Sequence, residues 1–463
     1  MEGIEDVWSA LGGDPSLVFR VSVVSRSGAL DARLPVRESA RACVAACALA
    51  AAELGARRAG LAEVPGVRVD DGAVAAAFTS ERHLRVDGRE PVSFAPLSRL
   101  WRTADGWVRT HANYPHHREQ LLGALKVPQD VAAVESVLAE RSAPEVEETV
   151  YAAGGLAVAL RTPEQWAASA QGGAVARLPL VERGRLDASP ARVFPSVSSS
   201  SASPLPPMGG VRVLDLTRVI AGPVATRTLA LLGADVLRVD PPGLPELADQ
   251  QADTGFGKRS ATLDLTADRE TFEALLGAAD VVVTGYRPGA LDRFGLSPEA
   301  LAGRRPGLVV AQLSAWGAQG PWAGRRGFDS LVQVATGIAV LEGTAGRPGA
   351  LPAQALDHGT GYLLAAGVLR ALTEQSYEGG SRYVRLALAR TAAWLTTGLR
   401  PDEAGAADDA GDTAYAGPEP WLAERDSRLG RLRYALPPVS FTGGPADWVR
   451  PPGPWGADAA RWT

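Results

Sequence analysis

Apolar runs alternate with stretches of helical spacing along the chain after residue 210. The runs that we expect to form strands are VRVLDL (211–216), DVLRVD (235–240), SATLDL (260–265), DVVVTGY (280–286) and LVVAQLS (308–314). Helical spacing lies between them, most clearly at 224–232 and 270–278. Strand, helix and strand at this spacing favour parallel pairing with right-handed crossovers. The pattern therefore predicts an α/β fold with a Rossmann-like parallel sheet.

Two polar stretches interrupt this pattern. Residues 195–210 are dense in Ser and Pro and have no apolar periodicity, which is typical of an exposed linker. Residues 401–418 are acidic and rich in Gly and Ala, and a short tail rich in Pro and Trp follows them. We expect the linker to divide the protein and the second stretch to separate a large body from its tail.

The first half of the chain contains a weak echo of the second. LPVRESARACVAACALAAAEL (34–54), followed by VRVDDGAVAAAF, can be laid on AQALDHGTGYLLAAGVLRAL (353–372), followed by YVRLALARTAAWL. In this register Arg37 falls where Asp357 lies, so only the second copy would carry an acid. The open alternative is that two Ala-rich helices followed by Val-rich strands resemble each other by composition alone.

Composition excludes some classes of function. A formal net charge of −5 argues against a nucleic-acid-binding surface, which needs clustered Lys and Arg. Cys43 and Cys47, four residues apart, belong to neither a disulfide framework nor a zinc pattern, which suits a reducing compartment. The acidic start has no signal-peptide pattern, and the apolar segment 44–54 is too short to span a bilayer. We expect a soluble, cytoplasmic protein without a membrane or nucleic-acid partner.

The segment 215–240 has the strand, turn, helix and strand of a nucleotide-binding unit and ends in Asp240. The G-x-G-x-x-G loop of dinucleotide sites is absent, because only Gly222 is available and Pro223 removes a backbone donor. This argues against NAD and FAD. The same loop remains suited to the phosphates or pantetheine of another ligand that carries a nucleotide.

Five ordered blocks carry a family resemblance over about residues 210–400. They are DLTRVIAGPVATRTLALLGADVLRVDPPG (215–243), GKRSATLDL (257–265), YRPGALDRFGL (286–296), LSAWGAQGPWAGRRGFD (313–329) and ALDHGTGYLLAAG (355–367). With these blocks the chain resembles the class III acyl-CoA transferases of the carnitine dehydratase and bile-acid-inducible family. That family includes formyl-CoA transferase, carnitine CoA-transferase and 2-methylacyl-CoA racemase. The resemblance implies coenzyme A or acyl-CoA as a substrate, with no prosthetic group and no metal.

Asp357 matches the catalytic aspartate of the transferases. The resemblance implies that its carboxylate attacks the thioester carbonyl and forms a mixed anhydride, and then an aspartyl-CoA thioester. We expect Gly359 and Gly361 to leave room for the ligand, and the helix start to offer free N–H groups to developing negative charge. The alternative role for Asp357 is a helix N-cap.

The resemblance also implies CoA contacts, several of them through the backbone. They are Arg218, Ile220, Ala221, Leu263, Leu265, Thr266, Gly285, Tyr286, Arg287, Arg293 and Arg326. Arg293 and Arg326 are the strongest candidates, because guanidinium groups clamp phosphate oxygens, although each arginine can equally be a solvated surface charge. One family arginine that contacts phosphate is replaced in this chain by Pro241.

Phe328 departs from the racemase branch of the family. That branch places a His immediately before the Asp that is written here as Asp329, and uses it as a base. Phenylalanine cannot accept a proton, so the sequence argues against racemisation. For Asp329 we expect a role in holding a loop through hydrogen bonds.

The small domain of the family, which ordinarily follows the large one, resembles segments 97–127 and 147–169 here. The chain is therefore circularly permuted or partly duplicated, and we expect five parts. They are a degenerate partial repeat (1–80), a smaller α+β domain (81–194), the linker (195–210), a Rossmann-like CoA-binding domain with the catalytic Asp (211–400), and a flexible segment with a Pro/Trp-rich tail (401–463). His111, His116 and His117 of the smaller domain lack the Cys or carboxylate pattern of a metal site, so we expect ordinary surface or hydrogen-bonded histidines.

The leading hypothesis is an acyl-CoA:carboxylate CoA-transferase whose partners are an acyl-CoA and a carboxylic acid. One alternative is epimerisation or dehydration at the α-carbon of an acyl-CoA. A second is a non-catalytic acyl-CoA-binding relative, because the glycine-rich loop of the family is replaced by REPVSFAPLS (89–98). We also expect a homodimer, because the apolar face of the Ala-rich helix at 40–54 must be covered.

Overall fold

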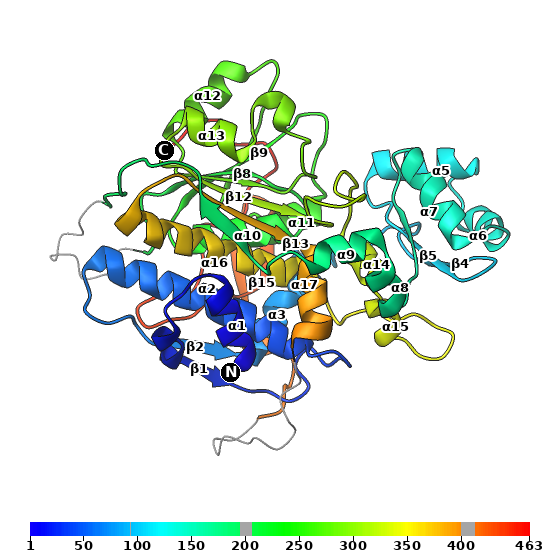
Figure 1. Ribbon diagram of the computed structural model, residues 1–463, viewed down its shortest axis with the longest axis horizontal. Helices are drawn as coiled ribbons and strands as arrows, with labels where there is room; N and C mark the ends of the chain where they lie inside the picture. Colours follow the sequence, from blue (N-terminus) through cyan, green and yellow to red (C-terminus); the bar gives the residue numbers. More distant parts are fainter. Residues whose placement is uncertain (93, 195–205, 400–412) are drawn as a thin grey trace.

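The computed structural model describes residues 1–92, 94–194, 206–399 and 413–463 (Figure 1). Most of the predicted linker and of the acidic stretch at 401–418 lies outside these residues. The described end of the linker is packed, because Arg58 donates from Nη1 to the carbonyl oxygen of Pro207 (2.8 Å) and from Nη2 to that of Gly209 (2.7 Å). Met208, between them, is fully buried.

A large sheet dominates the described residues, and its six strands after residue 210 are parallel. They are β8 (Arg212–Leu216), β9 (Asp235–Asp240), β10 (Arg259–Thr262), β11 (Val281–Thr284), β12 (Val309–Ser314) and β13 (Arg382–Ala387). Their order is β10-β9-β8-β11-β12-β13, so the direction of progression reverses between β8 and β11. The predicted α/β, Rossmann-like fold is confirmed.

Helices cover both faces of this sheet (Figure 1). α12 (Arg269–Ala278) and α13 (Pro298–Arg304) lie on one face, and α10 (Ala221–Leu231) and α16 (Ala355–Glu378) lie on the other. Side chains alternate across the strands: Leu214 and Val282 pack with the α12 side, whereas Val213 and Val281 pack with the α16 side. Both faces are therefore apolar, as parallel strands require.

The N-terminal part adds a further layer beyond α16. Its elements are α1 (Glu2–Ala10), η1 (Pro15–Arg20), β1 (Val21–Val24), α2 (Val36–Ala59), β2 (Val67–Asp70), α3 (Asp71–Phe78), α4 (Ser80–His83) and β3 (Arg85–Val86). β1 and β2 pair in parallel on the far side of α2. Helix, strand and helix follow one another here as in α16, β13 and α17 (Leu388–Ala393).

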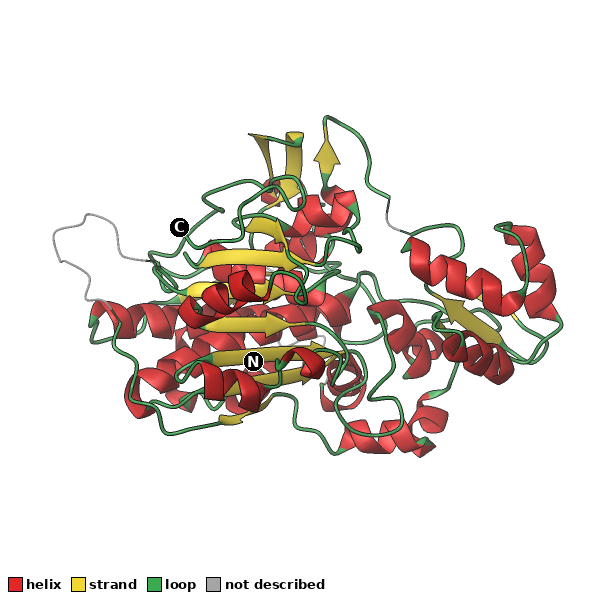
Figure 2. Ribbon diagram, turned by 90° about the horizontal axis from the view of Figure 1, so that it is seen from above, coloured by secondary structure: helices red, strands yellow, loops and turns green. Residues whose placement is uncertain are grey.

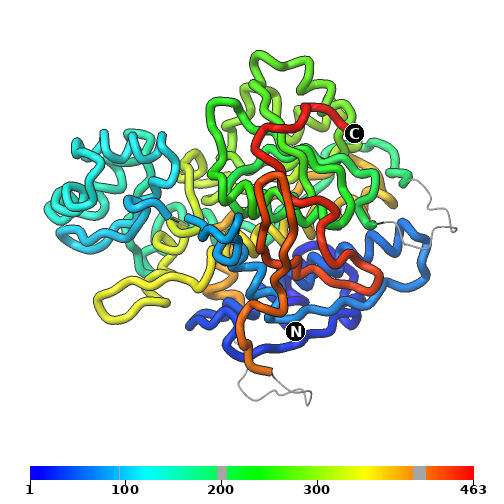
Figure 3. The backbone as a smooth tube through the Cα atoms, turned by 180° about the vertical axis from the view of Figure 1, so that it is seen from behind, coloured from blue at the N-terminus to red at the C-terminus, as the bar shows by residue number. Residues whose placement is uncertain are grey.

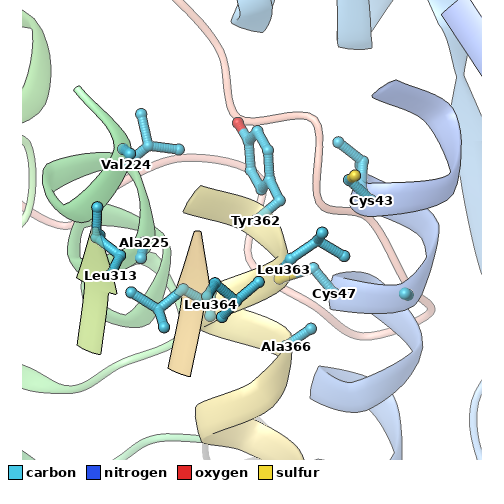
Figure 4. Close-up of a cluster of buried hydrophobic side chains, with 14 of the residues drawn as sticks. Cys43, Cys47, Val224, Ala225, Leu313, Tyr362, Leu363, Leu364 and Ala366 are labelled. Atoms are coloured by element: carbon cyan, nitrogen blue, oxygen red, sulfur yellow. The ribbon is translucent and has the colours of Figure 1, made fainter. Parts of the chain in front are cut away.

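α2 and α16 lie side by side and run in the same direction. Cys43 faces Gly359 near the two helix starts, and Arg57 Nε donates to Ser376 Oγ (3.2 Å) near the two helix ends. Small side chains allow this close approach, and Figure 4 shows Cys43 and Cys47 of α2 beside Tyr362, Leu363 and Ala366 of α16. The Ala-rich face of α2 is thus covered by the same chain.

The packing of α16 against α2 affects two expectations, the homodimer and the absence of a membrane span. The homodimer was expected because α2 needed a partner surface, and α16 supplies one, so the homodimer stays a prediction without that argument. α2 is also the one helix in the described ranges that is long and apolar enough to cross a membrane, but 89% of its apolar window is buried inside the protein.

A small α+β unit projects from one end of the molecule (Figure 2). It contains β4 (Leu100–Arg102), β5 (Trp107–Thr110), α5 (Pro115–Leu125), α6 (Val131–Ala139), α7 (Ala143–Ala152) and β6 (Ala157–Ala159), with the strand order β4-β5-β6. The unit has its own apolar core around Trp101, Leu121 and Val150. After α8 (Pro163–Ala168) and α9 (Ala170–Ala176), β7 (Glu182–Arg185) pairs antiparallel with β13. The segment 81–194 thus also contributes a strand to the large sheet.

The described C-terminal segment packs over the back of the protein (Figure 3). η4 (Glu419–Trp421) leads into β14 (Leu422–Ser427) and β15 (Gly430–Ala435), and β15 pairs with β3. Further along, Trp448 Nε1 donates to the carbonyl of Arg227 (2.8 Å) and Trp462 Nε1 to that of Leu275 (2.9 Å). The tryptophans therefore fix the tail against both layers of helices.

The remaining elements lie beyond the carboxyl ends of the strands or connect the layers. They are α11 (Ala248–Thr254), η2 (Asp292–Phe294), α14 (Asp329–Ala335), α15 (Ile338–Leu341) and a π-helical turn (Trp394–Gly398).

Replacing Gly361 should separate α16 from α10. A Cβ at Gly361 would lie 2.6 Å from the carbonyl oxygen of Ala221 and 3.0 Å from Val224. We therefore expect Gly361→Ala to lower the free energy of unfolding by about 1 to 3 kcal/mol, the usual cost of overpacking. Gly277→Ala in α12 is the control, because a Cβ there meets open space. Urea unfolding of the two variants checks this, and equal stability would contradict the packing described.

Candidate active site

A cavity of about 950 Å³ opens at the carboxyl ends of the six parallel strands. Leu216, Asp240, Leu263, Gly285, Ser314 and Leu388 line it, each at or just after the end of a different strand. Open parallel sheets bind ligands in this position, beside the point where the strand order reverses. Asp357, in the first turn of α16, also lines the cavity.

Asp357 lies beside a second buried carboxylate, Asp329. Asp329 Oδ2 accepts hydrogen bonds from the backbone N–H of Leu356 (2.9 Å) and of Asp357 (3.0 Å), and Gln333 Nε2 donates to Oδ1. Asp329 at the start of α14 thus fixes the start of α16. This matches the role expected for Asp329 in holding a loop.

Both carboxyl groups have a raised pKa, chiefly because they are buried. Burial raises the pKa of Asp329 to about 6, although the N–H donors oppose the shift. The pKa of Asp357 lies well above its usual value because of burial first, then the charges of Asp329 and Glu81. Asp357 is only 6% exposed, so water screens these charges poorly. The site therefore holds a carboxyl group that is unusually basic when ionised.

Five arginines line the cavity, namely Arg218, Arg287, Arg293, Arg325 and Arg326. Arg218 Nε lies 3.7 Å from Glu246. In the described part of the chain, Arg287, Arg293 and Arg326 have no carboxylate within ion-pair distance. Burial and the charge of Arg287 lower the pKa of Arg326, so the two cations repel each other. An anion between them would relieve this repulsion.

The loop after β8 is locked by Glu246. Its Oε1 accepts a hydrogen bond from Tyr114 Oη (2.5 Å), and its Oε2 accepts bonds from the N–H of Val219 (3.1 Å) and from Arg238 Nη2 (2.9 Å). Val219 has a φ of 72°, which is strained for a β-branched residue. Because Tyr114 belongs to the small unit, this cluster ties the small unit to the large sheet.

Three side chains of the small unit, Tyr114, His116 and His117, form one wall of the cavity. His111, behind them, stacks on Phe328 with a ring-centroid distance of 3.7 Å. Burial lowers the pKa of His117 to about 3, with smaller contributions from His116 and Arg326, so His117 is neutral near pH 7. Among the described residues no group of three or more His, Cys, Asp or Glu side chains is arranged to hold a metal.

The comparisons with known proteins concern the same part of the chain. Residues 208–415 match the family model described as CoA-transferase family III. This segment belongs to CoA-transferase family III. The family resemblance stated from the sequence blocks is confirmed.

Three curated relatives of this family III segment show how far the likeness extends. A protein of Mycobacterium tuberculosis described as a "probable fatty acyl-CoA transferase" is 35% identical over 204 residues, which are 41% of this chain and 52% of that protein. A formyl-CoA:oxalate CoA-transferase of Afipia carboxidovorans is 35% identical over 196 residues, 39% and 46% of the two chains. An acetyl-coenzyme A transferase of Hypoxylon pulicicidum is 34% identical over 215 residues, 44% and 36%. This chain therefore spans about half or less of these relatives.

Two crystal structures also match. One, of a hypothetical protein from Mycobacterium tuberculosis, has 36% identity and a TM-score of 0.40, and the match covers 42% of this chain and 59% of that one. The other, of a CAIB/BAIF family protein from Brucella suis, has 26% identity and a TM-score of 0.37, with 49% and 65% covered.

Within the family III segment the structure gathers nearly all the predicted site residues at the cavity. Those lining it are Arg218, Ala221, Leu263, Leu265, Thr266, Gly285, Tyr286, Arg287, Arg293, Arg326 and Asp357. Ile220 does not line it, because it lies at the N-cap position of α10 and packs into the core. Arg37 is also elsewhere, where it hydrogen-bonds Glu38.

Two expectations about α16 were wrong. The N–H groups of Leu356 and Asp357 are not free for a substrate, because both donate to Asp329. Gly359 and Gly361 do not make room for a ligand either. A Cβ at Gly359 would meet Cys43 of α2, and one at Gly361 would meet α10, so these glycines serve helix packing.

Several lining residues were not predicted. Asp240, Leu313 and Ser314 carry a usable signal, because each is one of the last two residues of a predicted parallel strand. Arg325 is adjacent to a predicted residue. Tyr114, His116 and His117 reach the cavity only through the placement of the small unit.

The raised pKa of Asp357 predicts a pH-dependent stability. A carboxyl group whose pKa is higher in the folded than in the unfolded state stabilises the fold below the unfolded value, near 3.9, and this stabilisation is lost as the pH rises through the folded value. Asp357→Asn, which stays neutral, should therefore unfold at higher urea than the wild type at pH 8, with a smaller difference at pH 5. Exposed Asp31→Asn is the control. An Asp357→Asn variant less stable than the wild type at pH 8 would contradict the like-charge strain.

Proposed function

We propose that this chain is an acyl-CoA:carboxylate CoA-transferase that works through a covalent intermediate on Asp357. The observation that carries the proposal is one cavity lined both by a buried, basic carboxylate and by three arginines that lack a carboxylate partner among the described residues. The relatives named above, described as fatty acyl-CoA, acetyl-coenzyme A and formyl-CoA:oxalate transferases, support the same reaction class.

The phosphates of CoA would lie among Arg287, Arg293 and Arg326. These guanidinium groups lack carboxylate partners in the described ranges, so an incoming phosphate does not have to displace one. The lining backbone from Leu263 to Thr266 would follow the nucleotide, and Asp264 already caps the N–H of Thr266 (2.8 Å). The pantetheine arm would then extend under Tyr114 and His117 toward Asp357.

The first half of the reaction transfers CoA from the donor to the protein. An Asp357 carboxylate oxygen attacks the thioester carbonyl carbon, the C–S bond breaks, and CoA leaves as its thiolate. The product is a mixed anhydride between Asp357 and the donor acyl group. The thiolate then attacks the Asp357 carbonyl of that anhydride, which releases the donor acid as a carboxylate and leaves an aspartyl-CoA thioester.

The second half repeats these steps in reverse with the acceptor. Its carboxylate attacks the aspartyl thioester carbonyl and expels the CoA thiolate, which gives a second anhydride. The thiolate attacks the acceptor carbonyl, so acceptor-CoA forms and the Asp357 carboxylate is regenerated. No proton is consumed, so the cycle needs no general acid. It does need Asp357 ionised, and we expect the rate to rise with pH because the pKa of Asp357 is raised.

Asp357→Ala should abolish transfer, because it removes the nucleophile. We expect CoA exchange between an acyl-CoA and a carboxylic acid, followed by chromatography of the CoA esters, to fall by roughly 10³-fold or more. The control is Arg37→Ala, at the position that echoes Asp357, which should keep wild-type activity. Residual activity of Asp357→Ala above a few per cent would exclude Asp357 as the nucleophile. Binding of CoA without exchange by the wild type across a broad panel of acids would favour a non-catalytic relative.

Arg326→Ala should weaken the affinity for acyl-CoA more than it slows the chemistry. Phosphate contacts act in the ground state and the transition state alike, so KM should rise roughly tenfold with a smaller change in kcat. Exposed Arg269→Ala, on α12 and outside the cavity, is the control. Steady-state kinetics check this, and an unchanged KM would remove Arg326 from the CoA site.

A further inference from the structure

The segment 325–328 is the part of the cavity wall that the small unit contacts most directly. All four of its residues line the cavity, and the segment leads straight into Asp329 at the start of α14. One contact is the stack of Phe328 on His111, which follows β5 of the small unit, at a centroid distance of 3.7 Å. The other contacts come from α7, and they act on the two arginines of the segment.

The two arginines are held in different ways. Arg325 makes ion pairs with Glu147 (Nη1 to Oε1, 3.3 Å) and with Glu148 (Nη2 to Oε2, 3.0 Å). Its guanidinium group also lies over the ring of Tyr151, 4.6 Å from the ring centroid. The charge of Arg325 is therefore already engaged by α7, whereas the side chain of Arg326 has no carboxylate partner in the described ranges.

The backbone of Arg326, in contrast to its side chain, is firmly bound. Its carbonyl oxygen accepts a hydrogen bond from Tyr151 Oη (2.9 Å) and another from Trp316 Nε1 (3.1 Å). Tyr151 belongs to α7 of the small unit, and Trp316 follows β12 of the large sheet. A Cβ at Gly327 would lie 2.7 Å from Trp316 Nε1, so only glycine fits at this close approach. The two donors thus hold the peptide that follows Arg326 in one orientation.

Tyr151 is itself anchored through the face of α7 on which it lies. Glu147, one helical turn earlier, is 5% exposed and lies on the same face. Its Oε2 accepts hydrogen bonds from the N–H of Ala159 in β6 (2.8 Å) and from Arg161 Nη1 (2.8 Å). The position of the Tyr151 hydroxyl is therefore set by the packing of the small unit.

We infer that Tyr151 is a positioning residue for Arg326, through which the small unit sets the affinity of the cavity for CoA. That the bound anion is a CoA phosphate rests on the proposed function. A side chain on a fixed peptide loses less conformational freedom when it binds an anion, so the hydroxyl bond favours binding. Asp329 is held separately, by Gln333 and by the N–H of Asp357, so the bond does not act on the chemical step.

The test is Tyr151→Phe, which removes the hydroxyl donor and keeps the ring beneath Arg325. The Kd for CoA in titration calorimetry and the KM for acyl-CoA should both rise roughly three- to tenfold, the effect of one hydrogen bond, with kcat unchanged. Tyr377→Phe on α16 is the matched control, because this tyrosine is 61% exposed, lies outside the cavity and keeps its ring contact with Arg57. An unchanged Kd in Tyr151→Phe, or a loss of kcat without a change in KM, would overturn the inference.

A double-mutant cycle separates positioning from a general loss of structure. In the Arg326→Ala background, Tyr151→Phe should leave the Kd for CoA unchanged, because its effect passes through the Arg326 side chain. An equal loss of affinity in both backgrounds would overturn the inference, since it would mean that the small unit is merely destabilised. Calorimetry with CoA needs no turnover, so the expected coupling in a protein that exchanges no CoA would count against the proposed function alone.

Discussion

The close packing of α16 between α10 and α2 is the constraint on which the site depends. Glycines and small side chains bring the three helices together, and a Cβ at Gly361 would already strike the backbone of α10. Because α16 cannot shift along its axis, its first turn stays at the carboxyl edge of the sheet. Asp357 is thereby held next to Asp329, in surroundings that oppose its ionisation. The burial that makes the fold compact therefore also raises the pKa of Asp357.

Two parts of the chain that are distant in the sequence line the cavity together. The segment that forms the large sheet provides the strand ends and the arginines, and the small unit provides Tyr114 and His117. Glu246 joins these two parts through Tyr114 and Val219. The parallel pair of equal helices, α2 and α16, is the physical link between the halves. Each half on its own would leave an apolar helix face uncovered.

The sequence predicted the parts of this arrangement that depend on local pattern. The apolar runs and the helical stretches between them located the strands of the large sheet. The five sequence blocks that carry the family resemblance located Asp357 and most of the residues now found around the cavity. Contacts between residues that are far apart in the sequence could not be predicted. Nothing local in Tyr114 or Tyr151 indicates which surface it meets, and the glycines of α16 indicated a need for space without indicating which neighbour fills it. The sequence likewise showed that the tail is rich in tryptophan, but it did not show that these side chains would contact β9, α10 and α12.

The central claim is that CoA becomes covalently attached to Asp357, and the intact mass of the protein tests it most directly. After incubation with acyl-CoA donors of increasing chain length, the wild type should gain the mass of CoA less one water, and peptide mapping should place the adduct on Asp357. Hydroxylamine should convert the adduct to a hydroxamate at the same residue, and Asp357→Asn should show neither product. A wild type that exchanges CoA between acids without any adduct, or with an adduct elsewhere, would contradict the account.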